Sequence, residues 1–339
     1  MTSREIVKRA IHFQSPPRLP FFQHEVDFVP DDVCDCWEMD RAKKGWFFDA
    51  VEGTTEDDWG CRWLHSDTRN MGQVVFHPLA DWAKLASFRP PDPRDPFYFE
   101  RLPELLDTAG ERYVIVTSHF TLIERLHMLH GFSETLVDFY ERPREIERLL
   151  DIILGFKIEQ LDELARRHGD RVDGIFLTDD WGSQQNAFVG VEMFRQFFLD
   201  RYARLFSSIH AHGWDVILHS CGRVNSLVPS FIEAGVDVLN MQQPQLYGLE
   251  EFGKTFAGRV AFLTTTDIQK TLPAMDPDLV REEARKLVRY WSTEKGGLIV
   301  FNYGHGEAIG VSPETTDVMF KAFSELMHYW SRERNGDPR

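Results

Sequence analysis

The stretch that decides the fold is residues 215–222, DVILHSCG. The run DVILH is short and mostly apolar, and it leads into a serine, a cysteine and a glycine. A run of this kind is typical of a strand that is buried on both faces of a parallel sheet. Similar runs, bounded by Gly, Asp, Ser or Asn, recur at residues 114–117, 174–178, 236–239, 260–263 and 297–302.

Between these runs lie stretches in which apolar residues repeat with a helical period, at residues 145–167, 191–212, 277–292 and 313–330. Gly169 and Gly213 follow two of them, as glycine often does at helix ends. Strands that alternate with helices indicate β/α units. With a further run at residues 18–22 we count seven strands and infer an eighth, which predicts an α/β fold of the (β/α)8 TIM-barrel type.

A doubly wound open sheet is the competing arrangement. It is disfavoured because no run is followed by a Gly-rich phosphate-binding turn.

We expect one domain over residues 1–339, entered by a helix that Thr2 and Glu5 cap and that ends near Phe13. Residues from about 23 to 112 are rich in aromatic side chains, so we expect them to form an N-terminal insertion that flanks the barrel mouth.

The composition excludes several classes of partner. The chain has 38 basic and 54 acidic residues, a net charge of −16, and no long basic run, so we expect no binding to nucleic acid. Its apolar runs are far shorter than the roughly 20 residues that span a bilayer, and its N-terminus lacks the apolar segment of a signal peptide. We therefore expect a cytoplasmic protein without a membrane partner, whose four cysteines are reduced.

The residues that directly follow the predicted strands are unusually polar. In a (β/α) barrel the reactive groups gather at the C-terminal ends of the strands, so all of these side chains should converge on one mouth. They are His119 and Glu124, Asp179 and Asp180, His219 and Cys221, Asn240, Gln242 and Gln243, Asp267 and Gln269, and Asn302 and His305.

His219 and Cys221 are the sharpest candidates for a metal site. Residues two apart in an extended chain project to the same side, and zinc accepts an imidazole and a thiolate in a tetrahedral site. His305, between two glycines after the last run, is the candidate for a third ligand. The alternatives are that Cys221 is a small buried hydrophobe, that His219 is a hydrogen-bonded strand end, and that His305 is an exposed turn residue.

The carboxylates after the strands have two interpretations. Asp180 and Glu124 are candidate oxygen ligands or acid–base groups, but such residues also cap the helix that follows. Asp179 and Asp180 should face opposite sides, and we predict that Asp180 points into the mouth while Asp179 caps. The other cysteines, Cys34, Cys36 and Cys61, lack metal-ligand spacing and are predicted to be structural.

Several ordered motifs make the whole chain resemble the uroporphyrinogen decarboxylase superfamily, which contains the haem-pathway decarboxylase and zinc-dependent, corrinoid-linked methyltransferases. The motifs are residues 58–61 (DWGC) with 77–79 (HPL), 121–125 (TLIER) with 131–132 (GF), 178–182 (TDDWG), 219–222 (HSCG) with 232–237 (IEAGVD), 267–269 (DIQ), and 302–306 (NYGHG) before 313–314 (PE).

This resemblance implies a (β/α)8 barrel and two possible activities. The decarboxylase carries an Arg-Gln-Ala-Gly-Arg motif that holds substrate carboxylates, whereas residues 21–27 here, FFQHEVD, contain no arginine and two acids. A polycarboxylate substrate needs cationic partners, so uroporphyrinogen is excluded. The methyltransferases place His-x-Cys and a later cysteine on zinc. His219 and Cys221 match the first two, and His305 stands where the later cysteine is expected.

The sequence therefore predicts a zinc-dependent methyltransferase that moves a methyl group between a corrinoid and a thiol or related small acceptor. No cobalamin-binding D-x-H-x-x-G motif is present, so the corrinoid is expected on a separate protein. Asp180 and Glu124 are assigned to catalysis, and Asp179, Gln242, Asp267 and Asn302 to substrate binding. The superfamily often pairs barrels, which implies a homodimer. The alternatives are a metal-free decarboxylase or lyase on a small substrate and a non-catalytic small-molecule-binding barrel.

Overall fold

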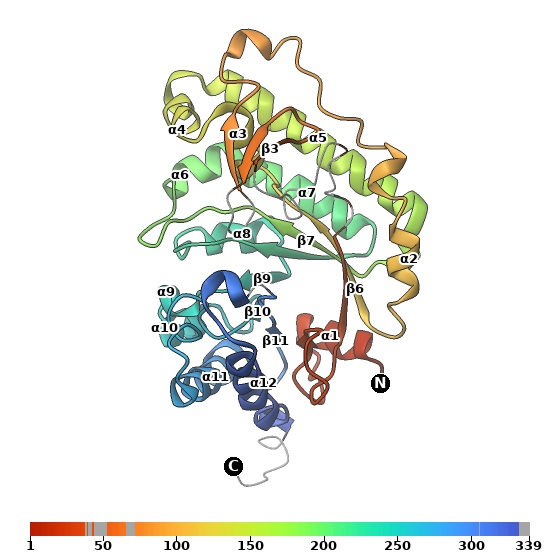
Figure 1. Ribbon diagram of the computed structural model, residues 1–339, viewed down its shortest axis with the longest axis vertical. Helices are drawn as coiled ribbons and strands as arrows, with labels where there is room; N and C mark the ends of the chain where they lie inside the picture. Colours follow the sequence, from red (N-terminus) through yellow and green to blue (C-terminus); the bar gives the residue numbers. More distant parts are fainter. Residues whose placement is uncertain (38, 40–42, 44–52, 66–71, 305, 332–339) are drawn as a thin grey trace.

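The structure, a computed structural model, describes residues 1–37, 39, 43, 53–65, 72–304 and 306–331. Within these residues, eight parallel strands form one sheet in the order β1-β11-β10-β9-β8-β7-β6-β2 (Figure 1). The sheet curves into a nearly closed barrel, which confirms the predicted (β/α)8 fold. The strands are β1 (Phe21–Phe22), β2 (Val33–Cys36), β6 (Tyr113–Ser118), β7 (Gly174–Thr178), β8 (Asp215–His219), β9 (Val238–Met241), β10 (Ala261–Thr264) and β11 (Leu298–Phe301).

The eighth strand, which the sequence only implied, is β2. It pairs in parallel with β6 and lies within the range 23–112 that we expected to be an insertion. Its sequence, VCDC, is short and interrupted by Asp35, so it does not resemble the other apolar runs. Val33 packs among the residues inside the barrel, whereas Cys34 and Cys36 are buried in the outer core.

Helices cover the outside of the sheet. The predicted helix at 191–212 is helical from Val191 to Ala211, and five of its residues, Arg195–Leu199, form a π-helix. The α-helices are α1 (Ser3–Ile11), α2 (Leu102–Asp107), α3 (Ile123–His130), α4 (Phe132–Glu141), α5 (Pro143–His168), α6 (Val191–Phe194), α7 (Asp200–Ala211), α8 (Val228–Ala234), α9 (Pro244–Tyr247), α10 (Leu249–Phe256), α11 (Pro277–Trp291) and α12 (Pro313–Glu325). None of the helices described here is long and apolar enough to cross a membrane.

Helix α1 closes the end of the barrel opposite the mouth. The predicted capping box is present, because the Thr2 side chain and the Glu5 carboxylate each accept a backbone N–H of the other residue. The apolar face of α1 packs into the barrel interior. Arg4 and Lys8 pair with Asp173, which precedes β7, at 2.7 and 2.8 Å.

A small antiparallel sheet lies away from α1, next to α3 (Figure 1). It consists of β3 (Gly53–Glu56), β4 (Arg62–His65) and β5 (Gln73–Phe76). Two contacts fix this sheet to α3. The Cys61 thiol donates to the Met128 carbonyl at 3.2 Å, and Arg125 pairs with Asp57 at 2.8 Å, both largely buried.

Candidate active site

Three potential metal ligands meet where β7 and β8 end. The Nε2 atom of His219 lies 3.3 Å from the Cys221 Sγ atom and 3.5 Å from the Asp180 Oδ1 atom. All three ligand atoms lie within 4.8 Å of one another, and the described part of the chain contains no second group of this kind. His219 and Cys221 leave the same strand, as their spacing predicted, and Asp180 comes from the neighbouring strand.

The loops after β7 and β8 are locked together, which fixes Asp180 beside Cys221. The Cys221 backbone N–H donates to Asp180 Oδ1 at 2.7 Å. Gly222 has a φ of +80°, and a Cβ atom there would lie 2.1 Å from the Gly182 carbonyl oxygen. The loops can approach this closely only because neither position carries a side chain.

Asn240, at the end of β9, sets the orientation of the His219 ring. Its Nδ2 donates to the Leu263 carbonyl at 2.9 Å, so its Oδ1 faces the Nδ1 atom of His219 at 2.8 Å. Because Oδ1 can only accept, the Nδ1 atom of His219 carries a proton, and Nε2 is the ring atom that faces Cys221 and Asp180 and is available to a metal. A histidine that ligates a metal is usually held in this way.

The two adjacent aspartates have different environments. Asp179 is fully buried, and its carboxylate accepts the backbone N–H groups of Leu122, Ile123 and Glu124 at 2.9 to 3.1 Å, and the hydroxyl of Tyr202. Asp179 thus caps α3 in this structure, while Asp180 joins the cluster with His219 and Cys221. Contact of Asp179 with substrate stays a prediction.

Glu124 lies in the first turn of α3, beside these aspartates, and is 5% exposed. Its carboxyl group accepts the Thr178 hydroxyl at 3.1 Å. Burial, followed by the charges of Asp180 and Asp179, raises the pKa of Glu124 well above its usual range. Burial and the same acidic surroundings also raise the pKa of the Cys221 thiol. These surroundings favour the neutral acid form of Glu124, which can donate a proton.

The other predicted site residues do not all join this cluster. Gln242 belongs to its outer layer, since its Nε2 donates to Asn240 at 2.9 Å. The Asp267 carboxylate is buried and accepts the backbone N–H groups of Gln245, in α9, and of Gln269 and Lys270. Asn302 accepts the Gly304 N–H at 3.3 Å. His305 lies outside the described residues.

The position of Asn240 could be predicted, but its role could not. A polar residue directly after an apolar run marks a strand end, yet only the structure shows that its amide orients His219. His127, on α3, was not predicted, because a helical pattern does not show which face of the helix lies toward the barrel mouth. Burial lowers the pKa of His127 to about 4, with Asp180 opposing the shift.

The fold and this polar cluster define a (β/α)8-barrel protein with a candidate catalytic site at the C-terminal ends of its strands. Residues 66–326 match the family described as Uroporphyrinogen decarboxylase (URO-D), and the chain belongs to this family of enzymes.

A solved structure of low sequence identity shares this fold. A methyltransferase from Methanosarcina mazei is 14% identical in sequence, with a TM-score of 0.70 over 96% of this chain and 99% of that one. An archaeal fructose-1,6-bisphosphate aldolase is 15% identical over 63% of this chain and 93% of that one, but its TM-score of 0.25 is too low to support any conclusion. No curated protein matches the sequence.

Proposed function

We propose that this protein is a zinc-dependent methyltransferase that moves a methyl group between a corrinoid protein and a thiol or related small acceptor. The observation that carries the proposal is the convergence of His219 Nε2, Cys221 Sγ and the Asp180 carboxylate at the mouth. The fold shared with the Methanosarcina mazei methyltransferase is consistent with it.

The residues present suit a zinc ion. Imidazole nitrogen, thiolate sulfur and carboxylate oxygen are the ligand types that zinc takes, and catalytic sites use three protein ligands and leave a fourth position open. His219 and Cys221 would supply two ligands. The third is either Asp180, which lies beside them, or His305, which the sequence motif favours.

Zinc bound there would act as a Lewis acid that lowers the pKa of an acceptor thiol. The chain's own groups would do the rest. Asn240 holds the His219 ring, and the locked loops hold Asp180 and Cys221 in place. Glu124 would handle a proton at its carboxyl group, and Asp180, where it does not ligate, would orient the substrate.

The corrinoid would arrive on a separate protein that docks over the mouth, because this sequence lacks a cobalamin-binding motif. The expected homodimer also belongs to the proposal, and light scattering at micromolar concentration would test it by giving twice the chain mass of 39.5 kDa.

A metal-free decarboxylase or lyase is the second candidate function. The buried Glu124 favours it, because burial raises its pKa and so favours the neutral acid, and decarboxylation leaves a carbanion that a neutral carboxylic acid can protonate. In that reaction the substrate C–C bond breaks, carbon dioxide leaves, and the Glu124 proton forms the new C–H bond.

An assay with free methylcobalamin and a panel of small thiols separates the two. Transfer predicts demethylation of the cobalamin and formation of a thioether in the wild type, and loss of both in Cys221→Ser. Cys61→Ser is the matched control, since Cys61 is also a free cysteine but lies in the turn before β4, outside the cluster. Equal activity in the wild type and Cys221→Ser would overturn the proposal. A wild type that transfers no methyl group but releases carbon dioxide from a small acid would favour the lyase.

A further inference from the structure

The barrel has a seam between β1 and β2, which stand at the two ends of the strand order. Among the described residues, Asp32, just before β2, joins the two strand segments by hydrogen bonds to Phe21 in β1. The Asp32 N–H donates to the Phe21 carbonyl at 2.8 Å, and the Phe21 N–H donates to the Asp32 carboxylate at 3.0 Å. Closer to the mouth, side chains hold the seam.

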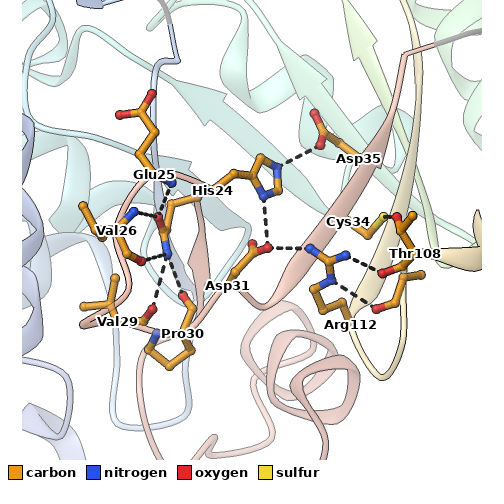
Figure 2. Close-up of polar contacts among 12 residues, drawn as sticks. His24, Glu25, Val26, Val29, Pro30, Asp31, Cys34, Asp35, Thr108 and Arg112 are labelled. Atoms are coloured by element: carbon orange, nitrogen blue, oxygen red, sulfur yellow. Dashed lines mark hydrogen bonds and ion pairs between the residues drawn. The ribbon is translucent and has the colours of Figure 1, made fainter. Parts of the chain in front are cut away.

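His24, two residues after β1, bridges this part of the seam. Figure 2 shows its ring between two carboxylates of the β2 segment. The Nδ1 atom lies 3.0 Å from Asp31 Oδ2, and the Nε2 atom lies 3.0 Å from Asp35 Oδ1. Ionised carboxylates can only accept, and a neutral imidazole has one N–H group, so both hydrogen bonds exist only in the protonated ring.

The charges around His24 favour its protonated form. Asp31 comes from the loop before β2, Asp35 from β2 itself, and Arg112, just before β6, donates to Asp31 at 2.5 Å. Two cations thus face two anions, with Glu25 as the neighbouring charge on the loop after β1. The hydrogen bonds that His24 donates to Asp31 and Asp35, the former first in size, raise its pKa to about 10, while partial burial opposes the shift.

The seam is connected to the mouth. Asp35 also accepts the indole N–H of Trp37, and the Trp37 ring lies 5.1 Å from the ring of His119, which follows β6. These contacts link the seam to residues at the C-terminal ends of β2 and β6.

We propose that His24 is an ionic clasp, whose protonated ring holds the mouth end of β1 against β2 and whose deprotonation releases this edge of the barrel. Deprotonation would leave a nitrogen lone pair facing a carboxylate, which is repulsive. Because the folded pKa lies above the ordinary 6.5, the stabilisation is fully present below pH 6.5 and is lost as the pH rises through about 10.

Two measurements test the clasp without any assay of activity. In ¹⁵N-histidine-labelled wild type, one imidazole should titrate with a midpoint near pH 10, and it should be missing from His24→Gln. The melting temperature of the wild type should fall by a few degrees more than that of His24→Gln between about pH 8.5 and pH 11. Other alkaline titrations affect both proteins and cancel in this difference.

His212→Gln is the matched control, since His212 pairs with the single carboxylate of Asp162 far along the chain from the seam. The melting temperature of His212→Gln should have the same pH dependence as that of the wild type. Cys34, on the other face of β2, does not interfere, because a hydrogen bond with Cys36 lowers its pKa to about 6, below this window. A wild type in which no imidazole titrates above pH 9 overturns the clasp, even if His24→Gln fails to fold. Equal pH dependence in wild type and His24→Gln also overturns it.

Discussion

The Oδ1 atom of Asn240 lies 2.8 Å from the Nδ1 atom of His219, so the ring donates through Nδ1 and turns its Nε2 atom toward Cys221 and Asp180. This relationship connects a residue outside the cluster with the ability of the cluster to bind a cation. It also shows why a strand-end asparagine matters here although it touches neither sulfur nor carboxylate.

Asn240→Leu should weaken zinc binding about 10- to 100-fold, because the His219 ring loses the acceptor that fixes its orientation. Asn240→Asp keeps an acceptor at this position and should bind zinc better than Asn240→Leu. Competition with a chromophoric chelator measures both affinities. Asn225→Leu, which alters an asparagine bonded to the Tyr247 carbonyl, is the control. Equal affinity of wild type and Asn240→Leu would contradict the proposed role.

Gly222→Ala should separate the loops after β7 and β8. The new Cβ atom would lie 2.1 Å from the Gly182 carbonyl oxygen, so the free energy of unfolding should fall by more than about 2 kcal/mol. Gly213→Ala is the control, since Gly213 has a φ of +79° but no atom within 4 Å of the added Cβ. It should cost about 1 kcal/mol in urea denaturation. Similar losses in the two variants would show that the loops are not locked.

The two aspartates should respond differently to alanine. Asp179→Ala removes the acceptor of three backbone N–H groups and of Tyr202, so it should lower the free energy of unfolding by about 2 kcal/mol or more. Asp180→Ala removes a less buried group and should cost less stability, while it weakens zinc binding if Asp180 is the third ligand. Urea denaturation and metal analysis of both variants test this. A larger loss of stability in Asp180→Ala, with weaker zinc binding in Asp179→Ala, would show that the capping and site roles of the two aspartates are exchanged.

The contact between Arg125 and Asp57 should hold the small sheet to α3. Both side chains are largely buried, so Asp57→Ala leaves a buried guanidinium without its carboxylate and should cost about 3 to 5 kcal/mol. Arg94→Ala is the control, because Arg94 and Glu159 form an exposed pair whose loss should cost under about 1 kcal/mol. An Asp57→Ala variant as stable as Arg94→Ala would rule out this anchor.

Much of the fold could be predicted because buried parallel strands carry a strong local signal. Strand β7 and helix α11 lie within one residue of their predicted bounds. Strand β2 could not be predicted in this way, since Asp35 breaks its apolar pattern and its pairing with β6 bridges a long insertion. Strand β9 begins two residues later than predicted, because residues 236–237 belong to the turn before it.

The site was predictable in part for the same reason. His219 and Cys221 leave one strand end two residues apart, so chain geometry alone places them together. The approach of Asp180 depends on contacts between two loops, and the His24 bridge depends on the barrel's closure, which no local pattern encodes.

The central claim is that His219 and Cys221 hold zinc, and metal analysis of protein purified without added zinc tests it most directly. The proposal predicts about one zinc ion per chain in the wild type and almost none in Cys221→Ala, with both proteins folded by circular dichroism. Asp180→Ala and His305→Ala, measured in the same way, identify the third ligand. A wild type that is folded and free of zinc even after incubation with the metal would contradict the claim.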